Sequence, residues 1–134
     1  MSDRRAVAPL TALLDADYRV VRVTAASSLM NLGIVRLDGE PGRKLEAAKQ
    51  EFVQALRAWP NVPDFRVDLG NYLALHGDLE NAIVEYQVAV QLDPAMVKAW
   101  FFAGQVQARL GQIDKAIAAW KKVRELQPGF PKID

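Results

Sequence analysis

Apolar residues recur at helical spacing along most of the chain, and glycine or proline interrupts them at intervals. In the second half, this pattern predicts helices over the ranges Pro63–Leu75, Leu79–Leu92, Val97–Leu110 and Ile113–Leu126. Glycine follows the first helix of each pair and proline follows the second, and both residue types commonly terminate helices. The second half is therefore predicted to form two helical hairpins.

The two predicted hairpins repeat one sequence pattern with a period of 34 residues. Residues 61–94 align with residues 95–128 without a gap, and small, aromatic and helix-ending residues recur in register: Gly70 with Gly104, Ala82 with Ala116, Tyr86 with Trp120 and Pro94 with Pro128. A glycine inside a helix costs about 1 kcal/mol relative to alanine. Both internal glycines therefore indicate a neighbouring helix too close for a side chain, and we expect Ala82 and Ala116 to lie opposite them.

This pattern resembles the tetratricopeptide repeat (TPR), in which paired helices, A and B, stack into a right-handed α-solenoid. An earlier unit is less regular: Ala48, Phe52, Ala55 and Pro60 lie 34 residues before Ala82, Tyr86, Ala89 and Pro94. Residues 43–60 are thus expected to form helix B of a degenerate first unit, ahead of the units at 61–94 and 95–128. Its helix A is displaced, because Leu32-Gly33 lies 37 residues before Leu69-Gly70. We expect the three extra residues in a turn at 38–42.

The N-terminal segment, residues 1–38, resembles a HEAT-type helical hairpin. The features that carry this resemblance are an apolar helix, an acidic turn and a second helix with typical positions: Pro9–Leu14, Asp15–Asp17, Val21-Arg22, Ala25-Ala26 and Leu29. A helix from about Tyr18 to Leu37 is expected to close this hairpin and to serve as helix A of the first TPR unit. The prediction is an all-α, right-handed α-solenoid of about seven antiparallel helices, a single domain over residues 1–134 with a tail at 129–134.

Composition excludes several classes of site. The chain has 17 basic and 16 acidic residues and a net charge of +1, which gives no reason to expect nucleic acid as a partner. Cysteine is absent and His76 is the single histidine, so we expect no metal site and no cofactor. No apolar run reaches the roughly 18 residues of a membrane span, so we expect a soluble chain, cytoplasmic or periplasmic, without membrane insertion. Motifs for catalysis are missing as well, and we expect no enzyme.

The TPR resemblance implies a protein-binding scaffold. The A helices of such arrays line a concave groove for a partner peptide or helix, and the family's groove positions include Val67, Asn71, Leu75, Lys98, Phe101, Gln105 and Arg109. Asn71 stands where peptide-binding members hydrogen-bond the ligand backbone. The family's clamp for a C-terminal carboxylate is incomplete, because Val67 and Phe102 replace its Lys and Arg. Lys98 and Arg109 beside apolar residues favour an apolar segment that carries acidic residues.

Two other interpretations stay open. No further helix A follows Pro128, so the apolar residues Ile117 and Trp120 lack a cover unless Phe130 and Ile133 fold over them. These four residues are the expected self-association surface of a homo-oligomer that stacks through its last repeat. The order of HEAT-like and TPR units also resembles that in larger exported proteins such as multihaem cytochromes, from which this chain would be an excised interaction module.

Overall fold

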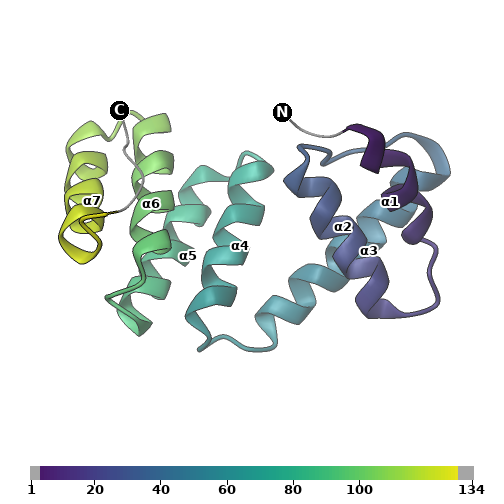
Figure 1. The fold of residues 1–134 in the computed structure, drawn as a ribbon, viewed down its shortest axis with the longest axis horizontal. Helices are drawn as coiled ribbons and strands as arrows, with labels where there is room; N and C mark the ends of the chain where they lie inside the picture. The colour runs from purple at the N-terminus through teal and green to yellow at the C-terminus, as the bar shows by residue number, and fades with distance from the viewer. Residues whose placement is uncertain (1–3, 130–134) are drawn as a thin grey trace. The chain divides into compact units, whose positions relative to one another are not determined.

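The structure is a computed structural model that describes residues 4–129, and every regular element in that range is helical (Figure 1). A short 3₁₀ helix, Arg4–Ala6, precedes seven α-helices: α1 Val7–Leu13, α2 Arg19–Asn31, α3 Gly39–Arg57, α4 Pro63–Leu75, α5 Leu79–Leu92, α6 Val97–Arg109 and α7 Ile113–Leu126. The prediction of an all-α fold with about seven helices is confirmed. Contacts divide the chain into two compact units, residues 1–58 and 59–134. A single domain over the whole chain therefore stays a prediction.

The unit of residues 59–134 consists of the two predicted hairpins, α4 with α5 and α6 with α7 (Figure 1). The helix bounds agree with the prediction to within one residue. One core cluster holds the two hairpins together, and its most buried members come from α4, α5 and α6: Val67, Ala82, Tyr86, Ala89 and Ala99. The hairpins thus share a core, as stacked repeats do.

The glycines inside α4 and α6 face aromatic rings. A Cβ atom on Gly70 would lie 2.5 Å from Cε1 of Tyr86, and one on Gly104 would lie 2.6 Å from Cδ1 of Trp120. Glycine is therefore required because the ring of helix B occupies the space of a Cβ atom. The expectation that alanines of the B helices lie closest to these glycines is wrong; the closest atoms belong to the two rings.

Three glycines in the left-handed conformation end the A helices. Gly33, Gly77 and Gly111 have φ values of 85°, 83° and 77°, which glycine adopts without steric cost. In each case the next N–H donates back to a carbonyl of the last turn, as in a Schellman motif: Ile34 N to Leu29 O at 2.9 Å, Asp78 N to Leu73 O at 2.9 Å and Gln112 N to Gln107 O at 2.8 Å. The three helices α2, α4 and α6 therefore end in one way.

The first A helix is shorter than predicted. α2 ends at Asn31 because Gly33 terminates it, whereas the helix was expected to continue to Leu37. Gly33 is consequently the counterpart of the helix-ending Gly77, and not of the glycine inside α4. The first A helix therefore lies 44 residues before the next one, rather than 37.

The extra residues of the first repeat form a connection that packs on α3. The turn expected at 38–42 is wrong, because α3 already begins at Gly39. The extended connection, residues 32–38, is held instead by Lys49, whose side chain is 3% exposed. The Lys49 Nζ donates to the carbonyl of Val35 at 2.9 Å. A lysine thus stands where the later repeats place isoleucine, and it satisfies a backbone group of the inserted connection.

The last residues expected in the first B helix lie outside it. α3 ends at Arg57, before Trp59, and Trp59 is 64% exposed. Trp59 is therefore exposed and does not pack in a core. Pro60, the next residue, lies just beyond the end of the helix, in agreement with its expected role as a helix breaker.

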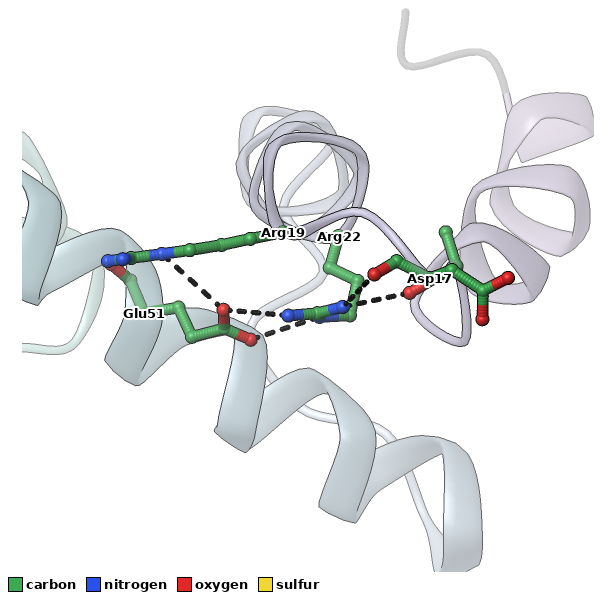
Figure 2. A network of polar contacts seen from close by, with 5 residues as sticks. Asp17, Arg19, Arg22 and Glu51 are labelled. Atoms are coloured by element: carbon green, nitrogen blue, oxygen red, sulfur yellow. Dashed lines mark hydrogen bonds and ion pairs between the residues drawn. The ribbon is translucent and has the colours of Figure 1, made fainter.

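An arginine joins the helices of the unit of residues 1–58 (Figure 2). Arg22 of α2 donates from Nε and Nη2 to the two carboxylate oxygens of Glu51 on α3, at 3.1 and 3.0 Å. Its Nη1 donates to the carbonyls of Ala16 and Asp17 in the turn after α1, at 2.9 and 3.1 Å. Arg19 adds a 3.5 Å ion pair to the same carboxylate. One guanidinium group thus links the α1–α2 turn to α3, and its hydrogen bonds lower the pKa of Glu51.

We predict that Gly70→Ala and Gly104→Ala each lower the free energy of unfolding by up to about 2 kcal/mol, measured by urea denaturation. Alanine would gain about 1 kcal/mol in helix propensity. The clash with the buried ring outweighs that gain, because overpacking costs about 1–3 kcal/mol. Gly129→Ala is the control, since a Cβ there meets nothing within 4 Å. Increased stability of either helix variant would contradict this packing.

We also predict that Arg22→Gln lowers the thermal unfolding midpoint at pH 7, measured by circular dichroism. The pKa of Glu51 is lowered in the folded state. Its contribution is therefore present above the unfolded-state pKa of about 4.3 and lost as the pH falls through the folded-state value. The difference between the variant and the native chain should thus shrink on acidification. Arg36→Gln in the exposed connection is the control, and an equal difference at all pH values would argue against the Glu51 interaction.

Candidate functional site

The expected groove residues lie mainly on one surface of α4 and α6, two helices that contact each other. We call this the A-helix surface: Asp64, Asp68, Asn71 and Leu75 of α4, with Lys98, Phe101, Gln105 and Arg109 of α6. The spacing of three or four residues places each set on one face of its helix. Asn71 and Phe101 are half-buried and the other six residues are exposed. Val67 is 1% exposed and belongs to the core cluster, so it is not part of this surface.

Opposite charges join the two helices at the start of the A-helix surface. Lys98 forms an ion pair with Asp64 across α4 and α6. Burial raises the pKa of Asp68, an effect that the charge of Lys98 partly opposes. Lys98 is therefore already neutralised in part by two carboxylates of the same chain. Arg109, at the other end of α6, is the more available cation.

Asn71 is held in one orientation by the neighbouring B helix. The phenol of Tyr86 donates to Asn71 Oδ1 at 2.6 Å. Burial raises the pKa of Tyr86, so the phenol keeps its proton and remains a donor at neutral pH. Because Oδ1 accepts this hydrogen bond, the amide nitrogen Nδ2 is the group left to bind a ligand. Asn71 is thus prepared to donate a hydrogen bond to a carbonyl oxygen.

The two adjacent phenylalanines of α6 have different environments. Phe102 stacks on Tyr86 with ring centroids 6.2 Å apart and packs against the core cluster. Phe101 meets Phe102 edge to face at 5.5 Å and stays half-buried. Phe102 is therefore a packing residue, whereas Phe101 offers part of its ring on the A-helix surface, where Leu75 of α4 is 45% exposed.

The structure describes two of the four residues of the expected self-association surface, Ile117 and Trp120. Ile117 is 43% exposed, whereas its counterpart Ile83 is 8% exposed within the core cluster. Trp120 is half-buried, with its ring against Gly104. Phe130 and Ile133 lie outside the described residues. Ile113, which is 54% exposed, adds a second apolar residue to the face of α7 that carries Ile117.

The sequence analysis missed a pocket of about 590 Å³ between α5, α6 and α7. It contains Gln107, which is 9% exposed. The repeat pattern indicates a difference at this position, because Gln107 stands 34 residues after the apolar Leu73. A polar residue at a repeated apolar position indicates a local change in packing or function.

Residues 4–129 contain neither a candidate metal site nor a helix that could span a membrane. No group of three or more acidic or histidine side chains in this range could hold a metal ion. No helix in it is both long and apolar enough to cross a bilayer. His76 lies at the end of α4, where its ring stacks on Tyr72 with centroids 4.2 Å apart and its Nδ1 is 2.7 Å from the Tyr72 carbonyl. This contact accounts for the histidine as a helix-ending residue.

Comparisons with known proteins agree with the repeat pattern. Models of the tetratricopeptide repeat match residues 42–97 and 97–130. The TPR repeat-containing protein MJ0941 of Methanocaldococcus jannaschii is 34% identical over 55 residues, which are 41% of this chain and 16% of that protein. The crystal structure of MamA superposes with a TM-score of 0.62 at 22% identity, over 93% of this chain and 68% of that chain. These matches do not test the HEAT-like resemblance of residues 1–38, which stays a prediction.

We predict that Tyr86→Phe lowers the free energy of unfolding by about 0.5–1.5 kcal/mol, because it removes the hydrogen bond to Asn71 without changing the ring. The side-chain amide signal of Asn71 should also become more mobile on the nanosecond scale, measured by ¹⁵N relaxation. Tyr18→Phe is the control, since Tyr18 is 74% exposed. Unchanged stability and amide mobility would show that Tyr86 does not orient Asn71.

Proposed function

Because the chain belongs to the tetratricopeptide-repeat family, whose repeats serve as scaffolds for protein–protein interaction, we propose that its A-helix surface binds a peptide segment of a partner protein. The observation that carries this proposal is the orientation of Asn71. Tyr86 occupies its carbonyl oxygen and leaves the amide nitrogen for a ligand. A donor held in this way suits the backbone carbonyl that every peptide offers.

The neighbouring residues define the kind of peptide. Leu75 of α4 and Phe101 of α6 supply apolar contacts on the same surface as Asn71, one from each A helix. Gln105 adds an exposed amide, and Arg109 adds a cation at the end of α6. An extended segment with an apolar side chain and an acidic residue would use all of these groups. The proposed partner is therefore a peptide of this composition, bound through its backbone by Asn71.

No catalytic role is proposed for the A-helix surface. Repeats of this family are typically non-catalytic scaffolds. Asp64 and Asp68 face Lys98 rather than a nucleophile or a general base. Binding at this surface needs neither a metal nor a cofactor, because its groups act as hydrogen-bond donors, apolar contacts and charges.

Self-assembly through α7 is the second candidate function. The exposure of Ile113 and Ile117 favours it, because the counterpart Ile83 is covered by the next repeat. A second copy of the chain would bury these residues in the same manner. The third interpretation, an interaction module excised from a larger exported protein, stays a prediction from the order of the repeats.

The A-helix surface is tested by a selection of random peptides on the native chain and on an Asn71→Ala/Arg109→Glu variant. We expect the native chain to enrich acidic peptides with an apolar residue, and the variant to bind them at least tenfold more weakly in fluorescence polarisation. The control is Lys121→Glu, an exposed charge change on α7. The proposed surface would be contradicted if none of the selected peptides lost affinity in the Asn71→Ala/Arg109→Glu variant, or if a folded native chain enriched no peptide.

Sedimentation velocity tests the second candidate. If α7 mediates self-association, the native chain should form dimers or larger species at high concentration, and Ile113→Lys/Ile117→Lys should be a monomer. Both residues are exposed, so the double variant should keep its fold, as checked by circular dichroism. A native chain that stays monomeric at millimolar concentration would exclude assembly through this helix.

A further inference from the structure

The pocket between α5, α6 and α7 lies within the unit of residues 59–134 and has a buried floor and an exposed rim. Its floor consists of buried residues: Tyr86, Ala103, Gln107 and Ala119. Exposed residues form the rim: Gln87, Gln91, Lys115 and Ala118. Val90, Trp100 and Lys122 are half-buried between them. A volume of about 590 Å³ is within the range of known ligand sites.

Gln107 on the floor carries an unpaired polar atom. Its residue exposure is 9%, and Oε1 has no hydrogen-bond partner among residues 4–129. Buried side-chain acceptors in folded proteins are nearly always paired, and an unpaired one destabilises the fold. The packing of α6 does not require this amide, because the preceding repeat has Leu73 at the same position and packs it against the core. A ligand that brings an N–H group would pair this buried oxygen once the Gln107 side chain turns toward the pocket.

The pocket lies where the preceding repeat has an ion pair. In the preceding repeat, Arg66 of α4 pairs with Glu85 of α5 at 2.8 Å. Their counterparts in the last repeat, 34 residues later, are Trp100 and Ala119, and both line the pocket. The tryptophan keeps one function of the arginine: Trp100 Nε1 donates to the Pro94 carbonyl at 3.0 Å, as Arg66 Nε donates to that of Pro60 at 2.8 Å. The side chain at this position thus still donates a hydrogen bond to the preceding loop. The ion pair is absent, and its place is part of the pocket.

The pocket and the A-helix surface use opposite faces of α6. Successive residues of an α-helix are turned by about 100°. Lys98, Phe101, Gln105 and Arg109 therefore form one stripe, and the pocket residues Trp100, Ala103 and Gln107 form another about half a turn away. A ligand in the pocket would leave the A-helix surface free. The two sites are consequently separable by mutation.

We propose that this pocket is a second binding site, for an acidic peptide segment of a partner protein. Once the Gln107 side chain turns toward the pocket, a backbone N–H of the peptide donates to its Oε1, and the peptide carboxylates lie near Lys115 at the rim and the half-buried Lys122. Lys122 has only a 3.7 Å contact with Glu125, whose side chain is 70% exposed, so a peptide carboxylate can replace it. Trp100 and Val90 contact the apolar part of the segment. A phosphate backbone fits less well, because its oxygens cannot donate to the buried acceptor.

A peptide selection with pocket variants tests this proposal, with random twelve-residue peptides displayed on phage as the probe. We expect peptides rich in Asp and Glu whose affinity, measured by fluorescence polarisation, falls at least fivefold with Lys115→Glu. Lys121→Glu on the same helix is the matched control, since Lys121 is exposed and does not line the pocket. The same peptides should bind the Asn71→Ala/Arg109→Glu variant normally, which separates this site from the A-helix surface.

The Gln107→Leu variant distinguishes a glutamine that binds a ligand from one that stabilises the fold. The variant restores the residue of the preceding repeat and removes an unpaired buried acceptor, so its thermal unfolding midpoint should rise. Its affinity for the selected peptides should fall about tenfold, through loss of one buried hydrogen bond. A lower midpoint for Gln107→Leu would overturn the proposal. So would acidic peptides unaffected by both pocket variants, no pocket-dependent peptide up to 1 mM, or a short RNA as the only pocket-dependent ligand.

Discussion

In both regular repeats, an aromatic ring of helix B packs against a glycine of helix A, in the space that a side chain would occupy. The packing of both repeats depends on this contact. Gly70 and Gly104 have no side chain, and the rings of Tyr86 and Trp120 occupy the space. This contact sets how closely the two helices of a hairpin approach. The loss of a helix-favouring residue costs about 1 kcal/mol, which is offset by burial of a large ring. The A-helix surface is built on this contact, because the ring seated on Gly70 also carries the hydroxyl group that orients Asn71.

The helical hairpins of the first unit include irregular segments, and polar side chains hold these segments in place. The connection after α2 is longer than in the later repeats, and Lys49 holds it through a backbone carbonyl. Arg22 holds the preceding turn and α3 through Glu51 (Figure 2). Both are hydrogen-bonded charges at positions that join separate segments. Both units have an apolar core, and the irregular segments of the first unit are held in addition by these directional contacts.

Substitutions between the two regular repeats give their surfaces different chemistry. Asn71 and Tyr86 form a hydrogen-bonded pair in one repeat, whereas Gln105 and Trp120 at the same positions do not, since Trp120 Nε1 has no hydrogen-bond partner in the described part of the chain. The face that carries the pocket also differs between the repeats, because the Arg66–Glu85 ion pair of α4 and α5 has no counterpart in α6 and α7. Two copies of one scaffold therefore offer different chemistry on opposite sides of α6. Divergence of single positions is sufficient for this, because the repeated core fixes the backbone.

The sequence by itself determined the helices, the period and the hairpins of residues 61–128, because helix periodicity and the terminating effects of glycine and proline are local properties. It also indicated that Gly70 and Gly104 mark close contacts. The tertiary structure decided what lies opposite them, that Val67 is buried, that Gly33 ends the first A helix and that Gln107 is buried without a partner. Spacing along a helix shows which residues share a face. Only the crossing of neighbouring helices determines which face is covered and which atoms meet there.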